Sequence, residues 1–408
     1  MGYLEKLLKK ELKPHELDAY LPPEEAVATR RKYVEQIAGT KLLHVANSSI
    51  DFADASKRNI ENAIGSVQLP VGFVELSVHG DYLNNDRALL FLATTEGKLV
   101  AGVNRGASAI NKSGGARTKI IGKGMSRSVI LDTGSAANSA KAMAYIRSKE
   151  GSELLRNAFK ESNKRIDLLD AELYTTGRLL FVRYVADTKA AMGMNMLTIA
   201  STYATEKLVE NLAKQGINAK FLSESGNMCV DKKPSAINMI RGRGVSVVAE
   251  AVVKADVLKA YFKVGSKEIE QLNYAKNYIG SSLAGSIAHN AHAANVLAAS
   301  FIAYGQDVAQ IVDAVNSVDD VKALENGDLY IAVYLPALEI GTYGGGTHRE
   351  TAKELLMASG VYGEGDETGN SKYALAELIA SGVLAGELNL LAAEAGRELA
   401  EAHSKLKR

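Results

Sequence analysis

The chain opens on a helical pattern and then changes to short apolar segments. Apolar residues recur at helical spacing through residues 3–39, with breaks at Pro14 and at Pro22–Pro23. This spacing predicts a small helical lead-in. Apolar and other residues alternate over 67–73, as they do in a half-buried strand, and helix formers with small residues fill 94–109. These two segments predict the start of a larger domain that contains both strands and helices.

A second block, residues 128–222, has the order strand, helix, strand, helix, strand. The strands are expected at SVILDT from Ser128, at Gly177–Asp187 and at NAKFLS before Glu224, and the helices at 135–160 and 196–215. This alternation is typical of a compact α/β unit. We therefore expect residues 128–222 to form a small domain that is inserted into the larger one.

Helical segments dominate the rest of the chain. They are expected at 250–275, 280–316, 349–359 and 371–404. The segment 280–316 is long and rich in alanine, and we expect it to be the central helix of the large domain. The predicted fold class is α/β (α+β), with a helical N-terminal arm at 1–39 and a large domain from 40–127 and 223–408.

Composition and charge exclude several classes of protein. The chain has 48 Lys and Arg against 47 Asp and Glu, a formal charge of +1, which argues against a nucleic-acid partner. Cys229 is the single cysteine and cannot form an intramolecular disulfide, so a reducing cytoplasm is expected. The most apolar stretch, 281–304, includes His289, His292 and Asn295, which would be costly in a bilayer. We expect a soluble cytoplasmic protein with no membrane partner.

Common catalytic motifs are absent from the sequence. It contains no GxxxxGK[ST], HExxH or GxSxG, and no GxGxxG after a strand, which argues against a P-loop or Rossmann site. His289 and His292 are three residues apart, but Asp307 would lie about 22 Å beyond His292 along one helix. We therefore predict no metal. Gly344–Gly346 is interpreted as a loop.

Four polar segments each have an ordinary structural explanation when taken alone. Glu96 precedes a predicted helix, where the helix dipole favours an acid. The Asp231–Lys233 turn, Asp307 and His403 fit a solvated surface. None of them alone predicts catalysis.

Seven blocks in chain order change this interpretation. They are ENAIGSVQLPVG (61–72), ATTEGKLVAGVNRG (93–106), AAMGMNM (190–196), SGNMCVDKKPSAINMIRGRG (225–244), AHAANVLAASFIAYGQD (291–307), LPALEIGTYGGGT (335–347) and VLAGELNLLAA (383–393). Together with His403 they resemble the catalytic region of 3-hydroxy-3-methylglutaryl-coenzyme A (HMG-CoA) reductase. The DKKPSAIN block is similar to class I, found in eukaryotes and archaea. The likeness runs from about Arg30 to His403 and is to the soluble archaeal form.

The resemblance implies a reaction and four catalytic residues. Two hydrides from NADPH would reduce the thioester of HMG-CoA to the alcohol mevalonate, an isoprenoid precursor, with release of coenzyme A. Lys232 matches the lysine that stabilises the oxyanion, and Glu96 the acid that protonates the aldehyde. Asp307 matches an aspartate in the same cluster, expected to raise the pKa of Glu96. His403 matches the histidine that protonates the coenzyme A thiolate.

Binding residues carry over in the same way. Positions that match the hydroxymethylglutaryl site are Arg127, Ser225, Asp231, Lys233, Lys276 and Asn295. Those that match the coenzyme A site are Asn104, Arg105 and His292. The cofactor loop is matched by Met192, Gly193, Met194 and Asn195, and the adenosine end by Asn163, Lys164 and Arg165. The two cations at the adenosine end suit a 2′-phosphate, which favours NADPH over NADH.

The chain departs from the family pattern in the cofactor loop. Lys189–Ala190 stand where the family has Gly-Asp before Ala-Met-Gly, so an acid is lost, and Asp187 is the candidate to replace it. Gly102 replaces a serine that is common beside the substrate. We expect these changes to affect cofactor affinity and not the reaction.

The resemblance also implies a ferredoxin-like small domain and a homodimer or higher homo-oligomer. The active site would form between subunits, with Glu96 and Lys232 from a different chain than much of the cofactor site. Two other hypotheses remain: a coenzyme A-binding protein that lost hydride transfer through the 187–190 loop, and a metal-dependent hydrolase that uses His289 and His292. The presence of all four catalytic residues favours the reductase.

Overall fold

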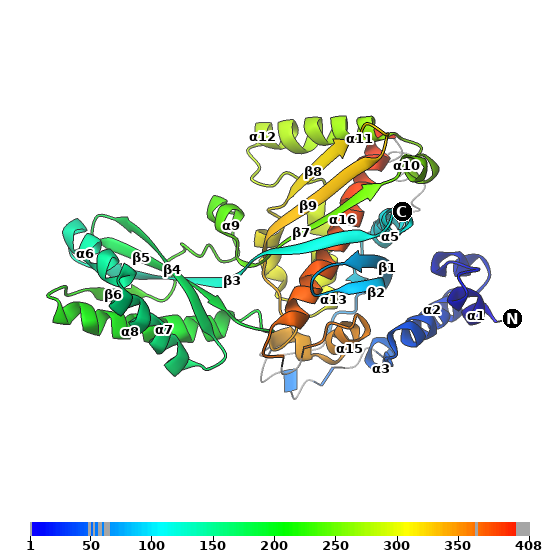
Figure 1. Cartoon of the computed structure of the whole chain (residues 1–408). Helices are drawn as coiled ribbons and strands as arrows, with labels where there is room; N and C mark the ends of the chain where they lie inside the picture. The colour runs from blue at the N-terminus through cyan, green and yellow to red at the C-terminus, as the bar shows by residue number, and fades with distance from the viewer. Residues whose placement is uncertain are drawn as a thin grey trace.

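The structure is a computed structural model that describes residues 2–47, 50–51, 54–55, 59–60, 66–363 and 366–396. His403 and the first five residues of the 61–72 block lie outside the described residues. Figure 1 shows a group of N-terminal helices at one end of the molecule, a small α/β unit at the other end, and a larger sheet with its helices between them.

The N-terminal arm is helical, as its sequence pattern predicts. It contains α1 (Tyr3–Leu8), a 3₁₀ turn (Pro14–Ala19) and α2 (Pro23–Ala38). Pro14 and Pro23 occupy the first positions of their elements, where the fixed φ of proline fits and its missing N–H is not needed. Leu7 and Tyr33 belong to a small core of the arm itself.

A mixed sheet with strand order β2–β1–β3–β7–β9–β8 forms the large domain. Its strands are β1 (Val71–His79), β2 (Asn84–Ala93), β3 (Ala116–Asp132), β7 (Gly244–Val253), β8 (Val318–Ala323) and β9 (Leu329–Leu338). Neighbours pair antiparallel except β1 and β3, which are parallel. The strand predicted over 67–73 begins only at Val71. Val67 is 88% exposed, so the alternation before Val71 is not matched by burial.

The helices of the large domain are mostly short. They are α3 (Leu43–Asn47), α5 (Leu99–Lys112), α9 (Ala236–Arg241), α10 (Ala255–Phe262), α11 (Ser266–Asn273), α12 (Ser281–Ala284), α13 (Ala293–Ala303), α14 (Ile311–Ala314), α15 (Glu350–Ala358) and α16 (Asn370–Ala395). Single turns of other helix types occur at Tyr274–Gly280, Val308–Gln310 and Gly345–His348.

The central helix is α16, and the prediction that 280–316 would fill this role is wrong. Gly285 adopts φ 72° and ends α12, and the chain is then irregular up to α13. His289 forms a bridge to Val318 in this irregular stretch, so His289 and His292 do not share a helix. The 26 residues of α16 extend for about 39 Å along the sheet (Figure 1) and contact α5, α13 and β7.

By length and composition alone, α16 is the one described helix that is apolar enough to cross a membrane. In the fold, 89% of its most apolar stretch is buried inside the protein. A continuous apolar surface on all sides is expected for a helix that is enclosed by a large core.

The small unit continues the same sheet through β3. Its elements are α6 (Ala136–Arg147), α7 (Lys149–Ser162), β4 (Asp167–Thr176), β5 (Leu179–Asp187), α8 (Met194–Lys214) and β6 (Lys220–Ser223). The first half of β3 pairs with β7, and the second half, from Met125, pairs with β5 and β6. The strands follow the order β4–β5–β3–β6, all antiparallel, around a separate apolar core.

Two sequence predictions in this unit are corrected by the structure. The helix predicted at 135–160 breaks at Ser148, whose Oγ accepts the N–H of Gly151 and so caps a second helix. The strand β4 was not predicted, because its half-exposed mixture of acids and apolar residues gives neither a buried run nor a clear alternation.

Candidate active site

An ion pair joins two of the predicted catalytic residues. The Lys232 Nζ lies 2.7 Å from the Asp307 Oδ2. The hydrogen bond that Lys232 donates to Asp307 raises the pKa of Lys232 above its usual value, although partial burial acts in the opposite direction. Lys232 is therefore a cation at neutral pH, and its side chain is 42% exposed, so it remains accessible to a substrate.

The loop that carries Lys232 has a strained backbone. Asn227, Val230 and Lys232 have φ of 57°, 46° and 58°, in the left-handed region that L-residues rarely adopt. For a β-branched residue such as Val230 this conformation is an outlier. Such strain persists only where the surroundings fix the backbone, and it concentrates at functional sites.

A buried network holds this loop from beneath. Asp231 accepts a hydrogen bond from Gln310 Nε2 at 3.0 Å and pairs with Arg243 Nη2 at 3.0 Å. The Arg243 side chain is fully buried and also pairs with Glu339. Its guanidinium lies 3.0 Å from the sulfur of Met194 in the predicted cofactor loop. Arg243 thus connects the Lys232 loop with the cofactor loop of the same chain.

This connection differs from the expectation that Lys232 and much of the cofactor site come from different chains. Arg243 Nη2 also approaches the Ser126 carbonyl oxygen at 3.4 Å, next to Arg127. Arg127 in turn donates from Nε to the Glu224 carbonyl oxygen at 3.0 Å and ties β3 to the start of the loop.

Glu96 lies in a second cluster. Asn295 Nδ2 donates to Glu96 Oε1 at 3.0 Å, and Glu96 is exposed just before α5. Asn295 belongs to the first turn of α13, whereas Asp307 follows the other end of that helix by four residues. No hydrogen bond or ion pair between described residues joins Glu96 to Lys232 or Asp307. The expected contact between Glu96 and Asp307 is therefore not formed within one chain.

The remaining predicted substrate residues divide between these regions. Ser225 is exposed in the loop, and Lys233 donates from Nζ to the Asp231 carbonyl oxygen at 3.0 Å. Lys276 lies in the π-helical turn and pairs with Glu394 of α16.

His292 is oriented by a buried carboxylate. Its Nδ1 lies 3.1 Å from Glu387 Oε1, and Glu387 also accepts the backbone N–H groups of Ala291 and His292. Because the carboxylate accepts, the ring carries a proton on Nδ1, and Nε2 is left for a ligand. Arg105 donates to Asn389 at 2.7 Å and lies 4.9 Å from the centroid of the Phe262 ring.

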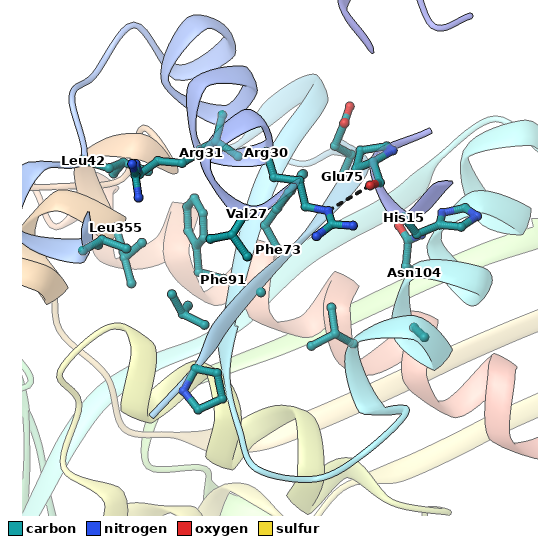
Figure 2. Close-up of a pocket in the computed structure, with 18 of the residues that line it drawn as sticks. His15, Val27, Arg30, Arg31, Leu42, Phe73, Glu75, Phe91, Asn104 and Leu355 are labelled. Carbon is teal, nitrogen blue, oxygen red and sulfur yellow. Dashed lines mark hydrogen bonds between the residues drawn. The ribbon is translucent and has the colours of Figure 1, made fainter. Parts of the chain in front are cut away.

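A cavity of about 760 Å³ lies between the N-terminal arm and the large domain. Asn104 from α5 lines it, together with Arg30 and Arg31 from α2 and apolar side chains that include Phe73 and Phe91 (Figure 2). Arg30 is already paired with Asp18 at 2.6 Å. The volume of the cavity is within the range of small-molecule binding sites.

The predicted cofactor loop leads into the N-terminus of α8. Gly193 adopts φ 89° and precedes the helix without a side-chain cap, which leaves the first N–H groups free for an anion. A Cβ at Gly193 would come within 2.4 Å of Thr188. Asp187, the candidate for the missing acid, is occupied by Lys189, whose Nζ lies 3.0 Å from it.

At the far end of the small unit, Asn163 ends α7 and accepts the N–H of Arg165. Lys164 and Arg165 are exposed. Within the described part of the chain, no group of three or more His, Cys, Asp or Glu side chains is placed to hold a metal ion.

Sequence reasoning missed the residues beneath the loop. Arg243, Glu339 and Asp313 are fully buried, as is Lys372, which reaches the carbonyl oxygen of Ala191 at 3.3 Å. A signal existed for two of them, since Arg243 directly precedes and Glu339 directly follows an apolar strand. A charge in that position requires a buried partner.

Comparison with known proteins shows the family of this chain. The family model for hydroxymethylglutaryl-coenzyme A reductase matches residues 26–408. The 3-hydroxy-3-methylglutaryl-coenzyme A reductase of Methanocaldococcus jannaschii is 42% identical over 407 residues, covering 99% of this chain and 98% of that protein. The enzyme of the same name from Aeropyrum pernix is 46% identical over 385 residues, covering 94% and 90%.

A solved structure has the same fold. The class II 3-hydroxy-3-methylglutaryl-CoA reductase of Streptococcus pneumoniae, bound to NADPH in open conformations, aligns with a TM-score of 0.65 at 20% identity over 97% of each chain. From the family match and the archaeal relatives, the chain belongs to the hydroxymethylglutaryl-coenzyme A reductase family and reduces HMG-CoA to mevalonate.

Proposed function

We propose that this reduction consumes two NADPH and two protons, and that Lys232, Glu96, Asp307 and His403 perform the chemistry. NADPH supplies the hydrides. The thioester carbon accepts the first hydride and the C–S bond breaks, so that coenzyme A leaves as a thiol. The resulting aldehyde accepts the second hydride and a proton to give the alcohol.

The ion pair between Lys232 and Asp307 is the observation that carries this proposal. A fixed ammonium group beside the substrate carbonyl stabilises the oxyanion that hydride addition creates. Asp307 keeps this ammonium charged, since it raises the pKa of Lys232. Lys232 thus stabilises the oxyanion in both reduction steps without giving up its proton.

Glu96 is proposed to protonate the aldehyde oxygen, with Asn295 orienting its carboxyl group. His403 is proposed, from the family resemblance, to protonate the thiolate. Because Glu96 and the Lys232–Asp307 pair lie toward opposite ends of α13, we propose a homodimer or larger oligomer. In it, Glu96 of one subunit meets Lys232 and Asp307 of the next.

Substrate binding follows from the remaining groups. The hydroxymethylglutaryl group would be held by polar and charged groups from both clusters: Arg127, Ser225, Asp231, Lys233, Lys276 and Asn295. Among these, the cations would hold its free carboxylate. Coenzyme A would extend from Glu96 along α5 past Asn104, Arg105 and His292. The cavity beneath α2 supports this path, since Val100, one turn after Glu96, and Asn104 both line it.

The small unit is proposed as the cofactor domain. Its strand order is that of a ferredoxin-like unit, and the free N–H groups at the start of α8 suit a dinucleotide phosphate held at Met192–Asn195. Asn163, Lys164 and Arg165 would hold the adenosine end, and the two cations favour a 2′-phosphate. We propose domain limits of 1–39, 40–127 with 223–408, and 128–222, and a cytoplasmic location.

The test is reduction of HMG-CoA by the purified protein, followed by nicotinamide absorbance. Lys232→Ala and Glu96→Gln should each lower kcat by at least about 100-fold, the loss expected when an oxyanion-stabilising group or a general acid is removed. Lys263→Ala is the matched control, because Lys263 is also exposed and left-handed, with φ 55°, but lies at the end of α10. Unchanged rates in the first two variants would contradict the proposed roles of Lys232 and Glu96. A preference for NADH over NADPH would contradict the proposed cofactor specificity.

A further inference from the structure

A buried carboxylate contacts the backbone of Lys232. Asp313, in the short helix α14, accepts the N–H of Lys232 at 2.8 Å through Oδ2. Its side chain is fully buried. The ammonium group of the same lysine contacts a different aspartate, Asp307. Lys232 is thus held at both ends, by one aspartate at its backbone and by another at its side chain.

The backbone of Lys232 needs such a contact. A left-handed conformation is unfavourable for an L-residue, and Lys232 has no glycine neighbour on either side to absorb the turn. The loop has no regular hydrogen-bond ladder, since it lies between β6 and α9. Within the described residues, Asp313 is the group that accepts this N–H.

We propose that Asp313 is a positioning residue that fixes the left-handed backbone of Lys232 and thereby aims its ammonium group at the reacting carbonyl oxygen. This inference rests on the proposed role of Lys232.

Two neighbours fix Asp313 in turn. Asn238 Nδ2 donates to Asp313 Oδ1 at 3.3 Å and also to the carbonyl oxygens of Cys229 and Val230. It therefore holds the same loop from the next helix. Arg243 Nη1 lies 3.7 Å from Asp313 Oδ2 and supplies a counter-charge. Burial raises the pKa of Asp313, and Arg243 opposes this effect.

A network of this kind favours catalysis more than folding. Burying a charged carboxylate carries a desolvation cost, which an apolar residue at the same position would avoid. Here the buried carboxylate of Asp313 accepts the backbone N–H of Lys232, which lies in a strained loop. The desolvation cost therefore accompanies a contact with the catalytic lysine. A displacement of the catalytic ammonium by about 1 Å is enough to lower the rate by as much as 100-fold.

The test compares Asp313→Ala with Asp313→Asn in the full-length enzyme. Alanine removes the acceptor, so kcat should fall by roughly 100-fold while KM for NADPH stays within about threefold. Asparagine keeps a carbonyl oxygen that can accept the Lys232 N–H. The kcat of Asp313→Asn should therefore be at least about tenfold higher than that of Asp313→Ala. Hydrogen exchange at the Lys232 amide should be faster in the alanine variant than in the asparagine variant.

Glu377→Gln is the matched control. Glu377 is also a fully buried carboxylate that accepts backbone N–H groups of a turn, those of Asp81, Tyr82 and Leu83, but this turn joins β1 and β2. The control should lower thermal stability and leave kcat per folded molecule near the wild-type value.

The outcomes separate this inference from the function on which it rests. A wild-type enzyme that is active, a Lys232→Ala variant that is not, and Asp313 variants with full kcat would overturn the positioning role alone. So would a loss of stability in Asp313→Ala that matches Glu377→Gln without a selective loss of kcat. Full activity in Lys232→Ala would instead overturn the proposed role of the lysine.

Discussion

At the scale of single residues, Lys232 is defined by the charges around it. Asp307 contacts its ammonium group, and Asp313 contacts its backbone N–H. The first contact raises the pKa of Lys232, since protonated lysine is the form that the carboxylate stabilises. Asp307 therefore favours the charged form of Lys232, and Asp313 is proposed to fix the orientation of its backbone.

Replacing Asp307 by asparagine removes the charge that favours protonated Lys232. The pKa of Lys232 should fall, so the loss of kcat at alkaline pH should begin at a lower pH than in the wild type. The measurement is kcat against pH for both enzymes. Asp81→Asn is the control, because Asp81 raises the pKa of Lys119 in the same way and the loop of Asp81 contributes no residue to the proposed site. An alkaline limb that stays in place would contradict this account.

Residues with a family motif could be predicted from the sequence, and their supports could not. Lys232, Asp307 and Asn295 lie in recognisable blocks, and the structure gives each of them a polar contact with another predicted site residue. Asp313 follows Ile311 and Val312 in a segment without a motif. Its partner is 81 positions away along the chain, so only the fold reveals the contact.

At the scale of elements, sequence patterns located most helices but not their roles. The Ala-rich segment 280–316 resembles a core helix in composition, yet Gly285 and Gly305 adopt positive φ and divide it. By contrast, α16 continues without a break for 26 residues. Helix length therefore depends on the few residues that interrupt the pattern, which composition does not reveal.

The first turn of α16 contains a buried lysine that contacts the cofactor loop. Lys372 Nζ lies 3.3 Å from both Thr188 Oγ1 and the Ala191 carbonyl oxygen. Burial lowers the pKa of Lys372 from 10.5 to about 8, although Asp187 and Asp366 oppose the shift. In the folded protein this lysine therefore loses its proton at lower pH than in the unfolded chain.

This shift predicts how the stability of a Lys372→Met variant depends on pH. Below about pH 8 the lysine is charged in both states, and the wild type bears the whole cost of burying the charge, at most roughly 3 kcal/mol. Between about pH 8 and 10.5 only the folded state gives up the proton, so wild-type stability rises with pH. Methionine should therefore stabilise the protein at pH 7, and its advantage should shrink by pH 10. Denaturant unfolding at both pH values measures this difference. An advantage of the same size at both would contradict it.

At the scale of the whole molecule, the proposed catalytic groups fall into two halves. The Lys232–Asp307 pair lies with the cofactor loop, since Arg243 contacts both regions, and Glu96 lies with Asn295 at the start of α13. Because α13 has 11 residues, its ends are about 16 Å apart. A second copy of the chain can bring the two halves together, and this is the central claim of the proposed mechanism.

Subunit complementation tests this claim most directly. A heterodimer of Glu96→Gln and Lys232→Ala chains, isolated with two different tags, should contain one site with both substitutions and one intact site. It should show roughly half of the wild-type rate, since a two-fold interface repeats the site once per subunit. A heterodimer of Lys232→Ala and Asp307→Asn chains should remain inactive, because those two residues act from the same chain. An inactive first heterodimer would contradict a site shared between subunits, and an active second one would contradict Lys232 and Asp307 acting from the same chain.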